Sequence, residues 1–328
     1  MNLFGVKYLK YQRLGKRFNS KRIFEIDFLR GFDILLMITV HFCFAASSTG
    51  LMDILFDKHS ASNGTIQAMN LFCGNVFTGI VNPIGIENPF GEGRFCLFFL
   101  EIFFSGLFVF LSGISCSFAR NNASRAFQLA YVSELMTVLL IAASVIMRWL
   151  SGDMCPVGDN SINCKFWNQN PQICIILGIL QSISIALLIY SLFDHFFNKF
   201  YQTFIAAIFW SIIAIITAYF ATDLETGYLH VATLPRDWWK LLLGLARYGD
   251  DYFSPTQVTA TLFLGASFGK LFYADRKSLL PASFKGKWAT PVLFLGRHSL
   301  AIYIFHMPIM YGLLMLIYLL AGYKIKGF

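Results

Sequence analysis

Seven long apolar segments dominate this chain of 328 residues. Each is long enough to cross a bilayer as a helix, which needs about 20 apolar residues. The segments are 27–47, 95–118, 128–150, 171–193, 200–221, 255–273 and 290–322. Because backbone groups in lipid must be hydrogen bonded within the segment itself, we predict an all-α fold, a polytopic helical transmembrane bundle of about seven spans. A composition of 56% hydrophobic and 13% charged residues also favours one membrane bundle over several soluble domains.

The basic residues predict the orientation of this bundle. Residues 1–22 contain seven Lys or Arg and no acid, so the N-terminus is expected in the cytoplasm, with no cleavable signal peptide. An odd number of spans then places the C-terminus outside. The expected domains are a basic segment 1–22, a transmembrane domain 23–323 with outer loops 48–94, 151–170 and 222–254, and a tail 324–328.

The outer loops leave two questions open. The apolar stretch Ile66–Val81 is either a re-entrant or interfacial helix, or an eighth span. Cys155 and Cys164 share one loop and form either a disulfide or two free thiols. We interpret the net charge of +8 as a signal for membrane orientation, because no basic patch with stacking aromatics stands apart from the membrane segments. We therefore expect no nucleic-acid partner.

Two histidines lie deep in the first and last segments. His41 is 14 residues past Asp27, and His306 is 15 residues past Pro291. At about 1.5 Å per residue, both rings reach a depth of roughly 21 Å in a core of about 30 Å. Ionisable side chains are costly there and mark functional sites by default. Two rings at one level predict a shared internal site.

The first segment carries a polar stripe. Asp27, Arg30, Asp33 and His41 fall, with Met37, within an arc of about 120° of the helix. Such a stripe is expected to face the bundle interior. Alternatively, Asp27, Arg30 and Asp33 are i,i+3 pairs that neutralise one another. That alternative accounts for the helix entrance but not for His41.

On the last segment, Ser299, Tyr303 and His306 share one face, with Arg297 and His298 at the inner entrance. Pro308 is expected to kink this helix and to free a carbonyl, so His306 is either part of the site or a structural partner of that carbonyl.

Three further polar residues are candidates. Glu101, about 10 Å deep in the second segment, lies close to the level of the histidines and can orient an imidazole. Gln181 lies near mid-membrane in the fourth segment. His59 lies in the first outer loop and is followed by Asn63-Gly64; by itself it is an ordinary solvated residue.

Several motifs resemble one known family. They are Arg22-Ile-Phe-Glu-Ile-Asp-Phe-Leu-Arg-Gly31 with His41, Phe110-Leu-Ser-Gly-Ile-Ser115, Leu177-Gly-Ile-Leu-Gln181, Gly265-Ala-Ser-Phe-Gly-Lys270 and Leu295-Gly-Arg-His-Ser-Leu-Ala-Ile-Tyr-Ile-Phe-His306. From Arg22 to about Gly312 the chain resembles the heparan-α-glucosaminide N-acetyltransferase catalytic-domain family in its bacterial form. The first and last motifs are the specific ones.

The resemblance implies a transmembrane acyltransferase that moves an acetyl group from cytoplasmic acetyl-CoA to an amino sugar across the membrane. Lysosomal members of the family carry a histidine beyond the first span, followed by Asn-Gly, and His59 with Asn63-Gly64 is the nearest match. Bacterial-type members carry a histidine at the position of His41. Either residue is a candidate base; we favour His41, with His306 as the second polar group.

Acyl transfer from a thioester fits these residues. An imidazole supplies a base near neutral pH. Ser299, Tyr303 or Gln181 are candidate donors to the developing oxyanion. The cations Arg30, Lys270 and Arg297 are expected at the inner mouth for the pyrophosphate of acetyl-CoA, the expected co-substrate. No metal is expected.

Two other classes of function compete with this interpretation. In a transporter or channel, the polar stripe is a substrate or proton path. In a membrane scaffold the histidines are structural, and we rank this class lowest. We expect a multi-pass protein of the bacterial cytoplasmic membrane whose partners are lipid, acetyl-CoA and a glycan or amino-sugar acceptor, and we leave a homo-oligomer open.

Overall fold

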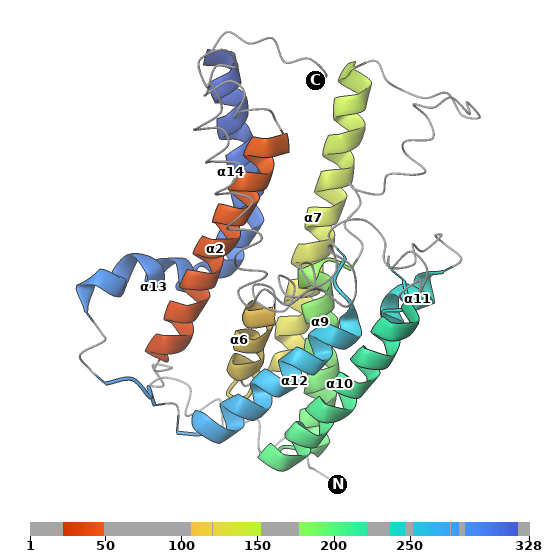
Figure 1. Cartoon of the computed structure of the whole chain (residues 1–328), viewed down its shortest axis with the longest axis vertical. Coiled ribbons are helices and arrows are strands. Elements are labelled where there is room, and N and C mark those ends of the chain that lie inside the picture. Colours follow the sequence, from red (N-terminus) through yellow and green to blue (C-terminus); the bar gives the residue numbers. More distant parts are fainter. Residues whose placement is uncertain are drawn as a thin grey trace, which may run out of the picture.

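The computed structural model describes residues 22–48, 106–119, 121–151, 177–221, 237–246, 252–275, 277–281 and 286–320. Within these ranges the chain forms helices and no strand (Figure 1). The helices are α2 (Phe24–Ser48), α6 (Gly106–Cys116), α7 (Asn122–Ser151), α9 (Ile179–Phe196), α10 (Phe200–Ala221), α11 (Trp238–Leu243), α12 (Pro255–Phe272), the 3-10 turn η4 (Lys287–Ala289), α13 (Thr290–Arg297) and α14 (Ser299–Leu320). The all-α prediction is confirmed for this part of the chain.

Each predicted membrane segment overlaps one of these helices, except the last, which overlaps two. The segment 200–221 coincides with α10, and α12 ends one residue before the predicted 273. By length and hydropathy, α9 and α10 are each able to cross a membrane, and α13 with α14 makes a third if that bent pair counts as one span. The count of seven spans and the cytoplasmic N-terminus stay predictions.

The last segment differs from its prediction as one span over 290–322. An 80° bend at His298 divides it into α13 and α14 (Figure 1). Glycine and basic residues end a helix and serine starts one, and the sequence Gly296-Arg297-His298-Ser299 has this order. Pro308 lies inside α14, which continues past it. A depth for His306 counted from Pro291 is therefore wrong, because Pro291 belongs to α13.

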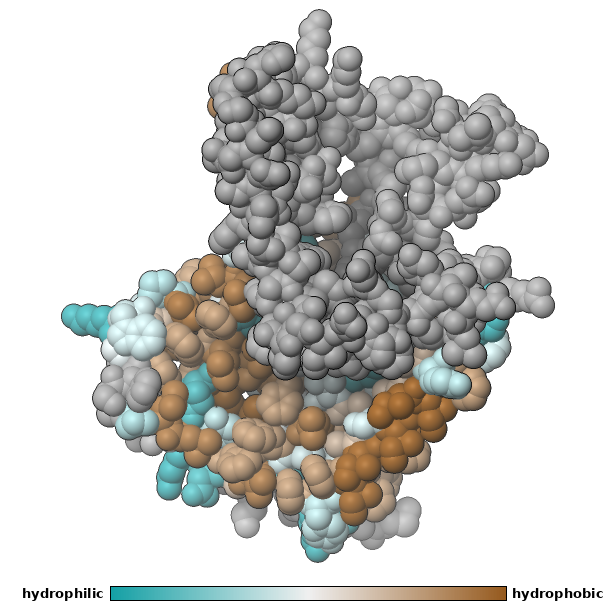
Figure 2. All heavy atoms as spheres, viewed as in Figure 1, coloured by the Kyte–Doolittle hydropathy of each residue, from teal (hydrophilic) through white to brown (hydrophobic). Residues whose placement is uncertain are grey.

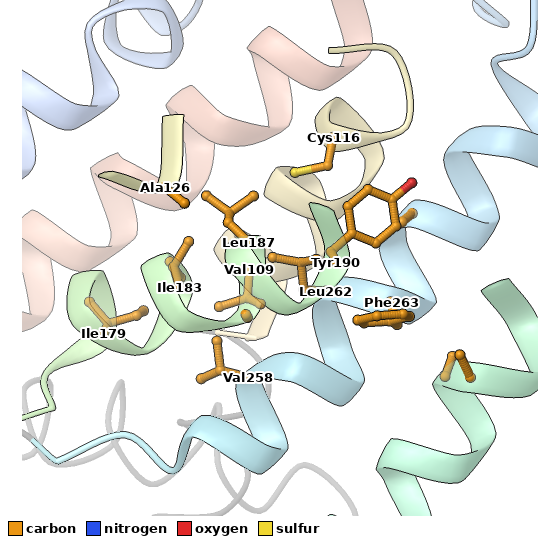
Figure 3. Packing of buried hydrophobic residues seen from close by; sticks show 14 of the residues in the cluster. Val109, Cys116, Ala126, Ile179, Ile183, Leu187, Tyr190, Val258, Leu262 and Phe263 are labelled. Carbon is orange, nitrogen blue, oxygen red and sulfur yellow. The ribbon is translucent and has the colours of Figure 1, made fainter. Parts of the chain in front are cut away.

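A hydrophobic cluster joins α6, α7, α9, α10 and α12. Leu187 of α9 and Leu262 of α12 lie at its centre, next to Val109 of α6 (Figure 3). The Tyr190 ring meets Phe263 edge to face, with centroids 5.3 Å apart. Such aromatic pairs add to the stability from buried area, so this region is a closely packed core.

Glycines set the approach of α6 to α12. A Cβ on Gly265 would overlap the carbonyl oxygen of Phe110, and a Cβ on Gly113 would overlap that of Leu262. Small residues let helix backbones pack closely in membranes, where van der Waals contact between helices is a main source of stability. The two helices therefore touch backbone to backbone.

The outer surface of this core is apolar. In Figure 2 a brown band covers the position that α10 occupies in Figure 1. Exposed hydrophobic residues of α10 include Ile205, Ile208, Phe209, Ile212, Ile215, Ile216 and Phe220. A contiguous apolar surface of this kind is typical of a face in contact with lipid.

The helices α2, α13 and α14 make a second unit. α2 packs on both α13 and α14, and α2 and α14 lie side by side in Figure 1. A Cβ on Gly31 would overlap the Val292 carbonyl, and a Cβ on Gly296 would overlap the Asp27 carbonyl. These reciprocal contacts fix where α13 crosses α2, and through it where α14 begins.

Candidate functional site

The structure brings His41 and His306 into contact. Nε2 of His306 lies 3.2 Å from Nδ1 of His41, and the ring centroids are 4.9 Å apart with an interplanar angle of 50°. Both side chains are half-buried. The proximity predicted for the two rings is therefore observed, between helices at opposite ends of the chain.

The α2–α13 crossing explains why the rings are level. Gly31 and Gly296 lie at this crossing, and each histidine comes ten residues after its glycine. Beyond the crossing α2 and α14 lie side by side (Figure 1). At 1.5 Å per residue, His41 is about 15 Å along α2 from Gly31. The two rings therefore lie at one level because of this crossing, and not because they are equally deep when counted from Asp27 and Pro291.

The hydrogen bonds around the pair indicate where the protons lie. Nδ1 of His306 is 2.6 Å from the carbonyl oxygen of Tyr303, which can only accept, so Nδ1 of His306 carries a proton. In a neutral His306, Nε2 is then the acceptor, and Nδ1 of His41 must donate to it. A neutral His41 is left with a lone pair on Nε2. The arrangement therefore produces one basic nitrogen.

A small pocket lies beside the pair. It is lined by Ser133, Met136 and Thr137 of α7, Gly178 to Gln181 at the start of α9, and Tyr303 of α14. The Tyr303 ring is 5.8 Å from the His306 ring, between centroids. Nε2 of Gln181 donates to Oγ1 of Thr137 over 3.0 Å. Through Tyr303, the hydroxyl and amide groups of this pocket adjoin the histidine pair.

The charged residues of α2 do not pair with one another. Nη2 of Arg30 donates to Oγ of Ser115 over 2.5 Å and to the Leu111 carbonyl over 3.2 Å, both on α6. None of the ion pairs between described residues includes Arg30. Asp27 instead lies 3.7 Å from both Arg22 and Arg297, between Oδ2 and a guanidinium nitrogen. Mutual i,i+3 neutralisation is therefore wrong as an account of the stripe.

Asp33 is the third charged residue of the stripe. Its side chain is 3% exposed, and its Oδ1 has no hydrogen-bond partner among the described residues. A buried polar atom without a partner costs about 1–3 kcal/mol. Natural folds rarely leave such an atom without a reason, and a ligand is one such reason.

The other predicted cations differ in their surroundings. Nζ of Lys270 is 2.6 Å from Oδ1 of Asp194 and 2.9 Å from Oγ1 of Thr203, which does not favour a free phosphate ligand. Arg297 is half exposed at the end of α13. Ser299 starts α14, on the face that carries Tyr303 and His306.

Some predictions fall outside the described residues. These are the candidates His59 and Glu101, the stretch Ile66–Val81 and the pair Cys155 and Cys164.

Sequence reasoning missed a second arginine, Arg125 of α7, which approaches the same end of α6 as Arg30. Nη1 of Arg125 is 3.5 Å from Oδ1 of Asn122, whose Nδ2 donates to the Cys116 carbonyl at the end of α6. The signal is the cluster Arg120-Asn-Asn-Ala-Ser-Arg125, which follows the second apolar segment in the sequence. We call the end of the molecule that holds Arg30, Arg125, Lys270 and Arg297 the basic end.

One family model matches the chain, that of the catalytic domain of heparan-alpha-glucosaminide N-acetyltransferase. The match covers residues 22–81 and 85–308, which is most of the chain and includes both histidines of the pair. No curated protein and no solved structure matches the chain. With the apolar helices, the match indicates an integral membrane acetyltransferase. The chain belongs to the heparan-alpha-glucosaminide N-acetyltransferase catalytic-domain family.

Proposed function

We propose that the protein transfers an acetyl group from acetyl-CoA, bound from the cytoplasmic side at the basic end, to a sugar or amino-sugar acceptor from the outer side. The observation that carries this proposal is the 3.2 Å contact between His41 and His306. Within a chain of this family, a histidine pair with one basic nitrogen is the group that acyl transfer needs.

His41 is the base in this mechanism. Its Nε2 takes the proton from the acceptor amine or hydroxyl as that group attacks the thioester carbonyl. The carbon–sulfur bond then breaks, and the leaving CoA thiolate takes the proton from the His41 imidazolium. Alternatively, Nε2 attacks the thioester carbonyl first, the carbon–sulfur bond breaks and CoA leaves as the thiolate. The acceptor then attacks the acetyl-imidazolium, the bond to Nε2 breaks, and the acceptor's proton passes to the thiolate. Both routes need the same lone pair.

His306 holds the base in position. Its Nε2 accepts from Nδ1 of His41 and so fixes the His41 tautomer, while Tyr303 fixes that of His306. When His41 becomes an imidazolium, this acceptor stabilises the new charge. The carboxylate of a serine-protease triad has the same function, although a neutral imidazole gives a smaller effect.

The surroundings of the pair supply the remaining roles. Gln181 and Tyr303 line the pocket, and Ser299 lies one turn before Tyr303; these are our candidates for donors to the oxyanion. Arg30 and Arg297 at the basic end are our candidates for the phosphates of the donor. Lys270 has a weaker case, because Asp194 already neutralises it.

Replacement of the base tests the proposal. His41→Ala in proteoliposomes should lower acetyl-CoA-dependent transfer by about 10²–10⁴-fold, the usual contribution of a positioned base. The matched control is His195→Ala, since His195 is an exposed histidine near the end of α9. Unchanged turnover in His41→Ala would exclude His41 as the base.

A binding measurement separates the enzyme from a transporter that uses the same polar stripe. A ligand that binds the folded state raises the unfolding temperature of that state. CoA and acetyl-CoA should therefore stabilise the detergent-solubilised protein, whereas a transporter for an unrelated solute should show no such shift.

A further inference from the structure

The buried carboxylate of Asp33 has no function in the transfer chemistry described above. It lies on the stripe between the basic end and the histidine pair, 3% exposed, and its Oδ1 lacks a donor among the described residues. Arg30, one turn earlier, donates to α6 and does not reach it as an ion pair. A group from outside the described chain is therefore the candidate donor to Oδ1.

The spacing of the stripe indicates what that group is. Arg30 and His41 are about 16 Å apart along α2 at 1.5 Å per residue, and Asp33 is about 4.5 Å past Arg30. In a phosphopantetheine arm, about 13 bonds separate the inner phosphorus from the thioester sulfur. At the reach of an extended chain, three bonds per residue, this corresponds to roughly 15 Å. The arm thus matches the distance from Arg30 to His41.

The polar groups of the arm match the position of Asp33. The hydroxyl of the pantoyl group is attached about four bonds from the phosphorus, and the first amide N–H lies about six bonds away, or roughly 5 and 7 Å. Both groups donate hydrogen bonds. A carboxylate oxygen about 4.5 Å along the helix from the phosphate ligand lies where one of these donors would be.

The phosphate end is also suited to this placement. Both arginines reach the end of α6: Arg30 donates to Ser115, and Arg125 bonds to Asn122, whose amide donates to the Cys116 carbonyl. Arg30 is in none of the ion pairs between described residues, and Arg125 is exposed. An anion bound by both of these cations would gain charge-assisted hydrogen bonds.

We propose that the donor binds with its phosphopantetheine arm extended along α2, its phosphates at Arg30 and Arg125, its pantoyl hydroxyl or first amide on Oδ1 of Asp33, and its thioester at His41. This inference rests on the proposed function, since it takes the donor to be an acyl-pantetheine thioester. It makes Asp33 a specificity residue for the arm.

Three donors of decreasing length test this placement. Acetyl-CoA has the phosphates, the pantoyl hydroxyl and both amides; acetyl-pantetheine lacks the phosphates; S-acetyl-N-acetylcysteamine lacks the phosphates, the hydroxyl and the first amide. The ratio of kcat/KM values between two donors, measured on one preparation, does not depend on how much of the enzyme is folded.

Each variant should change a different ratio. Asp33→Val should lower kcat/KM for acetyl-CoA and acetyl-pantetheine by about three- to tenfold relative to the cysteamine donor, the effect of one lost hydrogen bond. Asp33→Asn, which keeps an acceptor oxygen, should retain most of this preference. Arg125→Gln should lower kcat/KM for acetyl-CoA alone, by about tenfold or more. Equal losses for all three donors in Asp33→Val would overturn the inference.

A binding measurement keeps failure of the inference distinct from failure of the proposed function. If the wild-type protein transfers acetyl from none of the donors, the proposed function fails. Stabilisation of the wild type by pantetheine that Asp33→Val removes would then still support the arm site. Absence of stabilisation by both CoA and pantetheine would overturn the arm site as well.

Discussion

The α6–α9–α10–α12 region and the α2–α14 face differ in how far their charged side chains are neutralised by partners within the protein. In the first region polar side chains bind one another: Lys270 bonds to Asp194 and Thr203, and the Tyr190 hydroxyl donates to Asp194. Along α2, Arg30 bonds to Ser115 and to the Leu111 carbonyl but is in none of the ion pairs between described residues, and Oδ1 of Asp33 has no partner among them. The first arrangement stabilises a fold, whereas the second leaves capacity for a ligand.

The difference has a physical basis in packing. The residues of α9 that face the cluster are almost completely buried, and their helix approaches α12 through large apolar side chains (Figure 3). His41 and His306 are only half-buried, beside a small pocket. A close-packed interior has few voids, so a ligand needs a region such as the α2–α14 face. The two regions should therefore respond differently to mutation.

The largest effect is expected at His306. His306→Leu removes the acceptor for Nδ1 of His41 and with it the control of the His41 tautomer. We expect a decrease in kcat of about 10²–10³-fold, below the 10⁴ that a lost triad carboxylate costs. The measurement is steady-state acetyl transfer, with the unfolding temperature as control. A variant that transfers at the wild-type rate would show that His306 is structural.

A smaller effect is expected when glycines in the two regions are replaced. Gly265→Ala forces α6 and α12 apart and should destabilise the fold by about 1–3 kcal/mol, with little change in kcat per folded molecule. Gly31→Ala displaces α13 from α2 and so moves the His306 ring. Its main effect should be a decrease in kcat, with a smaller effect on the free energy of unfolding. Thermal unfolding and kcat are measured on both variants. If both variants lost the same stability and the same kcat, the two regions would not differ in the way described above.

The smallest effect is expected at Lys270. Lys270→Met leaves Asp194 without its cation; because the Asp194 side chain is 35% exposed, we expect a stability loss of only about 1–2 kcal/mol. The KM for acetyl-CoA should stay within about twofold, since Lys270 is already neutralised. The comparison variant is Arg30→Gln, which should raise that KM. If instead Lys270→Met raises KM without loss of stability, Lys270 is a phosphate ligand after all.

The positions of the helices could be predicted from the sequence more accurately than the long-range contacts between them. Apolar runs ended by polar or helix-breaking residues placed α10 and α12 almost to the residue, because hydropathy is a local property of the chain. The proximity of His41 and His306 was also predicted, although the count from Pro291 behind that prediction does not hold across the bend at His298. The bend at His298 was missed because the apolar character of residues 290–322 is nearly continuous, although Gly296-Arg297-His298-Ser299 carried the signal.

Long-range polar contacts were beyond a single sequence. The partner of Lys270 is 76 residues away, and that of Arg30 on α6 is 85 residues away. Periodicity places a side chain on a face of its own helix but does not say which helix covers that face. For this reason Lys270 and Arg30 had the same expected role, whereas the structure gives them different surroundings.

A double-mutant cycle of His41→Gln and His306→Gln, measured as acetyl transfer from acetyl-CoA in proteoliposomes, tests the paired imidazoles most directly. If the two rings act as one unit, His306→Gln should slow the wild type by about tenfold or more and should have almost no effect once His41 is replaced. Losses that simply multiply in the double variant, or a His41→Gln protein that turns over at the wild-type rate, would contradict the account.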